Sequence, residues 1–318
     1  MRPAGRRVRA MDTAALTRRV TSLSVAMAAV LVTLKAIVWG ISGSVALLAS
    51  TADSGLDLIA SGATFLAVRY AAAPPDEEHR FGHGKAEAFA GLLQAGLVFA
   101  SAALIGQEAV RHLFQPAPVK QEGWAIGVMI LSVALTLGLI GAQSWLLRRT
   151  QSVAVSADRA HYSADVASNI VALIGIAGTA LFGLTSLDAV AGAVVAAILL
   201  WGAVVVFREA SGELMDRELS DEARSQIAAL AMGDPAVSAV TQLRTRASGP
   251  IVHIQMNAEL DPKLSLEAAH NLVLAAEARI LEAFPAADII IHPDPSGRAE
   301  PHTGAFARAA VERDAGAA

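Results

Sequence analysis

Long apolar runs, each about the length of a membrane-spanning helix, fill the amino-terminal part of the chain. A helix rises about 1.5 Å per residue and the hydrocarbon core of a bilayer is about 30 Å thick, so a span takes roughly 20 mostly apolar residues. Small residues are frequent inside the runs, which favours close helix packing in lipid. Six spans are predicted: Val20–Ile41, Val45–Tyr70, Ala86–Leu113, Trp124–Leu147, Val153–Leu181 and Leu187–Phe207.

After Phe207 the pattern changes to that of a water-soluble domain. Two amphipathic stretches, Ser220–Met232 and Ser265–Phe284, begin with a serine at a capping position and predict helices. Three stretches rich in β-branched residues predict strands, and the resulting order of helix, strand, strand, helix, strand is typical of a ferredoxin-like open-faced sandwich. The predicted division is an arm (1–19), a six-helix transmembrane domain (20–210), an αββαβ domain (211–295) and a disordered tail (296–318).

Composition supports a membrane protein and narrows its chemistry. Hydrophobic residues make up 54% of the 318 residues and aromatic residues only 5%, and the mean hydropathy is +0.49. A net charge of -4 gives no indication of a nucleic-acid partner. Because the chain has no cysteine, disulfides and thiolate metal sites are excluded, and a metal ion would need His, Asp, Glu or backbone oxygen ligands.

Basic residues predict the orientation in the membrane. The arm, the second connection and the fourth connection carry Lys or Arg, whereas the first and fifth connections carry none. Positive charge collects on the cytoplasmic side, so we expect a multi-pass protein of the cell (inner) membrane with both termini in the cytoplasm. The apolar run after the arm is too long for a signal peptide, so we expect the arm to be retained.

Polar residues recur at matching places in two of the predicted spans. Asp53 and Asp57 are four residues apart in the second span, and His161 and Asp165 are four apart in the fifth. Each pair shares one helix face and is ninth and thirteenth in its span, near the middle of the membrane. A carboxylate at that depth costs roughly 2.5 to 3.5 kcal/mol, so a compensating partner is expected. Three carboxylates and one imidazole would suit a divalent ion such as Zn²⁺.

Other interpretations of these buried groups remain open. The four side chains could make hydrogen bonds between packed helices, or the carboxyl groups could be kept neutral by burial. Lys35 in the first span could be their counter-ion, or its ammonium could extend to the membrane surface.

The second connection holds another group with the spacing of metal ligands. In the sequence "PPDEEHRFGHGK", Asp76, His79 and His83 could enclose one ion at the membrane surface. The alternative is an ordinary solvated acidic loop.

These motifs together resemble the cation diffusion facilitator (CDF) family, particularly its bacterial zinc and iron exporters. The segments "DSGLD", "HRFGHGKAEAFA", "HYSADV" and "IIIHPDP" carry the resemblance, which covers residues 17–295. It implies a homodimer, a transport site and a loop site. The implied transport ligands are Asp53, Asp57, His161 and Asp165, and the implied loop ligands are Asp76, His79 and His83. It further implies a salt bridge between Lys85 and Asp216 near the dimer interface.

The carboxy-terminal domain departs from the family pattern. Relatives with a two-metal site there have histidines where this chain has Thr241 and Asn257, although His270, His292 and Asp294 match. The resemblance therefore implies at most a single, weaker ion held by those three residues, to which His253 could contribute. His270 could equally be a surface histidine.

We therefore expect a metal/proton antiporter that exports a divalent cation by alternating access, with Zn²⁺ the first choice and Fe²⁺ or Cd²⁺ as alternatives. His161 can bind metal only when neutral, so protons and metal ions compete for it. A membrane-anchored metal sensor or scaffold, and a drug/proton antiporter, are the alternatives. No enzyme is expected, because the chain has no P-loop, nucleophile elbow or HExxH motif, and no cofactor beyond the bound or transported ion is predicted.

Overall fold

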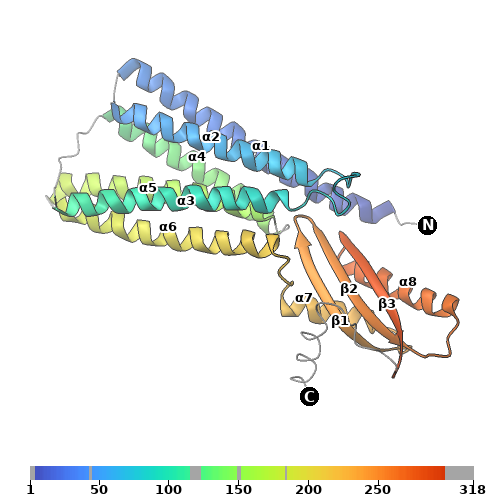
Figure 1. Cartoon of the computed structure of the whole chain (residues 1–318). Coiled ribbons are helices and arrows are strands. Elements are labelled where there is room, and N and C mark those ends of the chain that lie inside the picture. The colour runs from blue at the N-terminus through green and yellow to red at the C-terminus, as the bar shows by residue number, and fades with distance from the viewer. Residues whose placement is uncertain (1–3, 43–44, 115–122, 149–151, 183–184, 298–318) are drawn as a thin grey trace. The chain divides into compact units, whose positions relative to one another are not determined.

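The computed structural model describes residues 4–42, 45–114, 123–148, 152–182 and 185–297 (Figure 1). Within these ranges some side chains are also outside the described set, among them that of Asp53. The chain divides into two compact units, a helical unit over residues 11–215 and a second unit that groups residues 1–10 with the residues from 216 onward, called here the carboxy-terminal unit.

The apolar runs of the sequence form long helices whose limits follow the predicted spans closely. The helices are α1 Ala4–Ser42, α2 Val45–Ala71, α3 Ala86–Phe114, α4 Gly123–Leu147, α5 Val153–Phe182 and α6 Thr185–Leu214. The main difference is at the amino terminus, where α1 begins at Ala4, well before the predicted span. The arm is therefore continuous with the first helix, because its Ala, Arg, Met and Leu residues favour helix.

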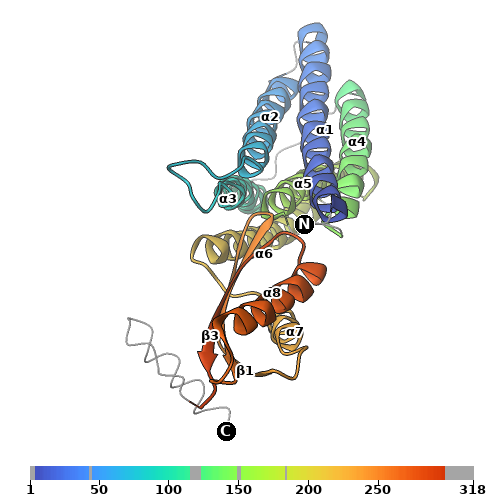
Figure 2. The same cartoon turned by 90° about the vertical axis from the view of Figure 1, so that its right-hand side faces the viewer.

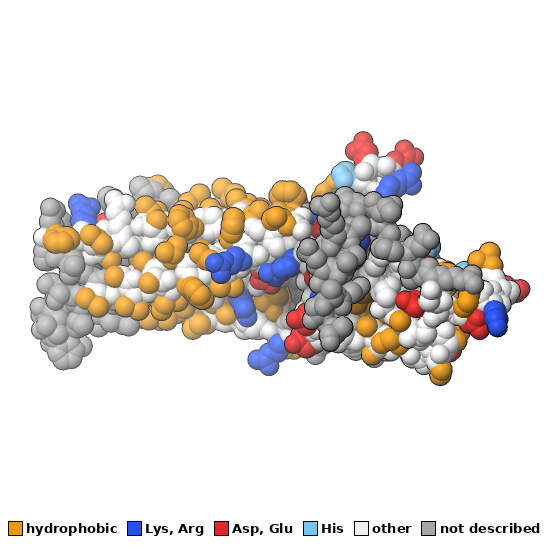
Figure 3. Space-filling model, turned by 60° about the horizontal axis from the view of Figure 1, so that its bottom comes forward, with side chains coloured by type: hydrophobic (Ala, Val, Ile, Leu, Met, Phe, Trp, Pro, Cys, Tyr) orange, Lys and Arg blue, Asp and Glu red, His pale blue; other side chains and the backbone are white. Residues whose placement is uncertain are grey.

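By length and apolar composition, four helical segments in the described residues could cross a membrane: Ala15–Ile41, Ala86–Arg111, Ile130–Leu147 and Gly192–Leu214. The helical unit also exposes large apolar side chains such as Ile41, Leu56 and Ile59. Hydrophobic side chains are spread over the helices on the face drawn in Figure 3. Exposed apolar surface of this extent is expected where lipid is the solvent.

Small residues bring α3, α5 and α6 close together. Val98, Ala164 and Leu199 belong to a buried cluster that joins these three helices. At Gly192 of α6, an added Cβ would lie 3.1 Å from the Cβ of Ala109 in α3. Close backbone approach through glycine and alanine is the usual packing mode of helices in lipid.

The carboxy-terminal unit has the predicted order of elements, α7 Asp221–Ala231, β1 Val237–Ser248, β2 Ile251–Leu260, α8 Leu266–Ala283 and β3 Ala287–Pro295. Ser220 and Ser265 cap the two helices, accepting hydrogen bonds from the backbone N–H groups of Ala223 and Ala268. The sheet order is β1-β2-β3, with β1 antiparallel and β3 parallel to β2. Figure 2 shows α7 and α8 on the same side of this sheet.

Alternation along the strands gives the sheet two different faces. Ile254 of β2 and Ile291 of β3 join the core with Ile280 of α8. Residues at the alternate positions point to the opposite face, and these include Asn257 and the neighbouring His292. The fold therefore directs the candidate ligands of β3 away from the hydrophobic core.

Candidate metal centre

The middle of α2 and the first half of α5 contribute a buried pair of ligand-type side chains. The Nε2 atom of His161 lies 3.0 Å from an oxygen of Asp57. Both residues are buried, with 5% and 8% of their surfaces exposed. The two residues are separated by 104 positions in the chain, so only the packing of α2 against α5 brings them together.

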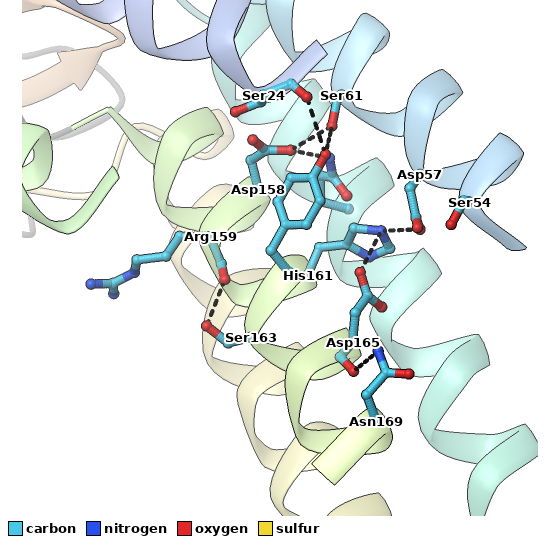
Figure 4. A network of polar contacts seen from close by, with 12 residues as sticks. Ser24, Ser54, Asp57, Ser61, Asp158, Arg159, His161, Ser163, Asp165 and Asn169 are labelled. Carbon is cyan, nitrogen blue, oxygen red and sulfur yellow. Dashed lines mark hydrogen bonds and ion pairs between the residues drawn. The ribbon is translucent and has the colours of Figure 1, made fainter. Parts of the chain in front are cut away.

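Asp165 extends this pair to a group of three. One of its carboxylate oxygens lies 3.8 Å from His161 Nε2, and ligand atoms of Asp57, His161 and Asp165 all lie within 4.8 Å of one another. Figure 4 shows the imidazole between the two carboxylates. The fourth predicted ligand, Asp53, lies one turn before Asp57 in α2, and its side chain is outside the described residues. Two carboxylates and an imidazole are a donor set that suits Zn²⁺ and similar divalent ions.

A second polar layer lies one helical turn away from this group. Asp158, three residues before His161 in α5, is 1% exposed. One of its oxygens accepts hydrogen bonds from Ser61 of α2 at 3.3 Å and from Gln94 of α3 at 3.2 Å. The other oxygen accepts from Gln143 of α4 at 2.8 Å. Asp158 is therefore held by donors from three other helices.

Hydroxyl groups extend the layer to α1. The hydroxyl of Tyr162 lies 2.7 Å from that of Ser61 and donates to the carbonyl oxygen of Ser24 at 3.4 Å. Gln143 also donates to the Ser24 hydroxyl at 3.1 Å. Figure 4 shows Ser24, Ser61 and Asp158 gathered beside the Asp57–His161 pair.

Sequence analysis did not single out Asp158, although a signal was present. Asp158 is a third ionisable residue on the His161 face of α5, one turn from it. What could not be read from the sequence is that its partners come from α2, α3 and α4. Lys35, considered a counter-ion, is buried in α1 and donates to Ser54 of α2 at 2.6 Å.

The connection between α2 and α3 brings together all three ligand-type residues predicted there. Asp76 lies 3.2 Å from Nδ1 of His79 through one oxygen and 3.1 Å from Nε2 of His83 through the other. The three residues form the second group of potential ligands in the described part of the chain. His83 is buried, and its ring lies against that of Tyr70 at a tilt of 55°, with the ring centres 4.4 Å apart.

Local hydrogen bonds fix the Asp76 carboxylate. It accepts from the backbone N–H of His79 at 2.6 Å and from that of Glu78 at 3.0 Å. The bond from the His79 N–H is the main cause that lowers the pKa of Asp76. Asp76 is therefore ionised at neutral pH, which is the form that binds a cation.

The ligands predicted in the carboxy-terminal unit are only partly brought together. His292 Nε2 lies 3.2 Å from an oxygen of Asp294, whose other oxygen accepts a hydrogen bond from the Asn257 amide at 2.8 Å. His270 is exposed on α8, and within the described residues it joins neither group of three potential ligands. The reason lies in the sheet: α8 packs on the face opposite to His292. His253 pairs with Asp288 at 3.1 Å.

The residues expected to form a salt bridge near the dimer interface have other contacts within their own units. Lys85 donates to the carbonyl oxygen of Leu214 at 3.2 Å. Asp216 pairs with Arg246 at 3.1 Å. A bridge between Lys85 and Asp216 stays a prediction.

Comparisons with known proteins agree with the motifs. The family described as "Cation efflux transmembrane domain" matches residues 22–215, and "Cation efflux protein, cytoplasmic domain" matches residues 219–296. The cation-efflux pump FieF of Klebsiella pneumoniae is 38% identical over 281 residues, 88% of this chain and 93% of the relative. FieF of Salmonella choleraesuis is 38% identical over 280 residues, with the same shares covered.

A solved structure described as the zinc transporter CzrB in its zinc form is 27% identical, with a TM-score of 0.25; the match covers 27% of this chain and 99% of that chain. The family matches and the FieF relatives cover most of the sequence. The chain therefore belongs to the cation diffusion facilitator family of cation efflux transporters.

Proposed function

We propose that this cation efflux transporter exports a divalent metal ion in exchange for protons, with Zn²⁺ the favoured ion and Fe²⁺ and Cd²⁺ the alternatives. The observation that carries the proposal is the buried contact between Asp57 and His161, with Asp165 beside it. Asp53 would complete a four-ligand cage from two helices. Such a donor set combines charge neutralisation with a nitrogen ligand, which favours zinc over harder ions such as Mn²⁺.

Exchange follows from competition for the same atoms. An imidazole binds metal through a neutral nitrogen, and carboxylates bind it when ionised, so protons and the metal ion displace each other. The ion would enter from the cytoplasm, and a rearrangement of α2 against α5 would open the cage to the other side. The proposal includes six membrane spans with both termini in the cytoplasm. It also includes a homodimer located in the inner membrane of the cell.

A transport assay tests this proposal directly. Purified protein in proteoliposomes is given Zn²⁺, Fe²⁺, Cd²⁺ or Mn²⁺, and the internal metal concentration and the internal pH are recorded together. We expect metal flux coupled to proton flux in the opposite direction, fastest with Zn²⁺. Metal binding without any flux would instead support a membrane-anchored sensor, and flux without a pH change would contradict proton exchange.

A further inference from the structure

Beside the proposed transport cage, the Asp158 layer forms a carboxylate site with no assigned role. We propose that Asp158 carries one of the exchanged protons: its carboxylate is ionised while the metal ion is bound and takes up one proton when the ion leaves. This inference rests on the proposed metal/proton exchange and adds a proton site outside the metal ligands.

Burial among uncharged hydrogen-bond donors is the first reason. Asp158 is 1% exposed, and the side chains that donate to it, Ser61, Gln94 and Gln143, are all uncharged. A negative charge inside a membrane domain is costly unless it is balanced. A bound dication in the neighbouring cage would supply that balance, and its departure would remove it.

The glutamine amides supply the second reason. Both amides donate an N–H to Asp158, while Oε1 of Gln94 and Oε1 of Gln143 are buried without a hydrogen-bond partner in the described part of the chain. Half a turn of either amide would exchange its nitrogen and oxygen, so that Oε1 faces Asp158 and accepts a hydrogen bond from the O–H of the protonated carboxyl group. The same side chains can therefore satisfy the carboxylate as donors and the carboxylic acid as acceptors.

The position of Asp158 couples it to the metal ligands. Ser61 lies one turn after Asp57 in α2, and Asp158 lies one turn before His161 in α5. Among the described side chains, the titratable groups on this side of the layer are Asp57 of α2 and His161, Tyr162 and Asp165 of α5. The other packed helices contact the layer through neutral side chains, namely Ser24 of α1, Gln94 of α3 and Gln143 of α4.

A neighbouring residue offers a matched control. Arg159 follows Asp158 directly, yet Figure 4 shows its side chain pointing away from the layer. A change at Arg159 therefore alters the charge of α5 without touching the hydrogen bonds of Asp158.

The test counts protons. Zn²⁺ is added to the purified full-length protein in weakly buffered detergent solution, and the protons released per bound ion are measured with a pH indicator. The measurement is repeated between pH 6 and 8, over the part of this range in which the protein is stable. Metal binding releases protons from groups that must lose them, so Asp158→Asn should release about one proton fewer per ion than the wild type. The asparagine side chain can both donate and accept hydrogen bonds, so it fits the same hydrogen-bond network as Asp158. Arg159→Gln should match the wild type.

Equal proton release from Asp158→Asn and the wild type would overturn the inference while leaving the proposed exchange intact. A wild-type protein that binds Zn²⁺ without releasing protons would contradict the exchange itself. If Asp158→Asn does not fold, Gln94→Met provides the test. Gln94→Met removes a donor to the ionised form and an acceptor for the protonated form, and the hydrogen bond to the charged form is the stronger of the two. The pH dependence of Zn²⁺ affinity should therefore move upward by roughly one pH unit, with the affinity at high pH unchanged. An unshifted curve would overturn the inference.

Discussion

The group of potential ligands inside the helical unit and the group in the α2–α3 connection differ in how they are built. Asp76, His79 and His83 come from one short segment, and hydrogen bonds between neighbours in sequence hold them. Asp57 and His161 come from two helices, 104 residues apart. The connection can therefore keep its geometry while helices move, whereas the group on α2 and α5 depends directly on how these two helices pack.

This difference assigns separate tasks to the two groups under the proposed function. A transported ion must be bound and then released on the other side, which requires ligands whose distances change between two states. Ligands on separate helices meet that requirement. Ligands within one connection are better suited to a retained ion, which stabilises or regulates the protein.

The largest effect is expected at Asp57. Asp57→Asn keeps the shape of the side chain but removes its charge, so metal/proton exchange in proteoliposomes should fall by more than roughly 100-fold. Ser163→Ala, on the exposed side of α5, should retain wild-type exchange. Undiminished flux in Asp57→Asn would remove the group on α2 and α5 from the mechanism.

A change of ligand type should alter selectivity more than rate. His161→Asp replaces nitrogen with oxygen, so the ratio of Zn²⁺ to Mn²⁺ transport should fall by roughly tenfold, or about 1.4 kcal/mol. The measurement is a competition assay with both ions in the same proteoliposomes. An unchanged ranking of the ions would mean that His161 does not contact the transported ion.

Weaker effects on transport are expected in the connection. His83→Ala should reduce binding of the ion held there by roughly 10- to 100-fold, with exchange falling only a few-fold. Calorimetry and the proteoliposome assay measure the two quantities on the same preparation. Glu77→Gln, an exposed neighbour outside the group, serves as the control. Equal losses of binding and exchange would show that the two groups are not separable.

The smallest effect, an increase in Zn²⁺ binding, is expected in the carboxy-terminal unit. Asn257 donates its amide to Asp294, and Thr241 pairs with Asn257 across the sheet. Changing both to histidine replaces an N–H donor with two metal ligands, and should raise Zn²⁺ binding by roughly tenfold. Gln255→His changes a residue two positions from Asn257 on the same face of β2, and it should leave Zn²⁺ binding unchanged. Equal binding by both variants would mean that Asn257 does not limit the site.

Local sequence patterns were sufficient for much of this protein. Most helix limits followed from apolar run length, because a helix in an apolar environment must satisfy its backbone polar groups with internal hydrogen bonds. The start of α1 at Ala4 did not follow from it. The αββαβ order followed from capping serines and from alternation in the strands. The Asp76–His79–His83 group was also predictable, since its members are close in sequence and meet by local folding.

Longer-range relations needed the structure. The family resemblance placed His270, His292 and Asp294 in one set, whereas the sheet separates α8 from the face that carries His292. In the sequence, Asp158 is one more polar residue of α5. In the structure, hydrogen-bond donors from α2, α3 and α4 surround its carboxylate.

The sequence by itself determined which segments are helices or strands and which polar residues share a helix face, because those relations depend on neighbours and on a fixed residue period. The matching polar pairs and the family resemblance predicted that Asp57 and His161 share a site, and the tertiary structure shows their contact. Only the tertiary structure shows that Gln94 and Gln143 enclose Asp158. Such contacts depend on the rotation and packing of helices far apart in the chain, which no local pattern specifies.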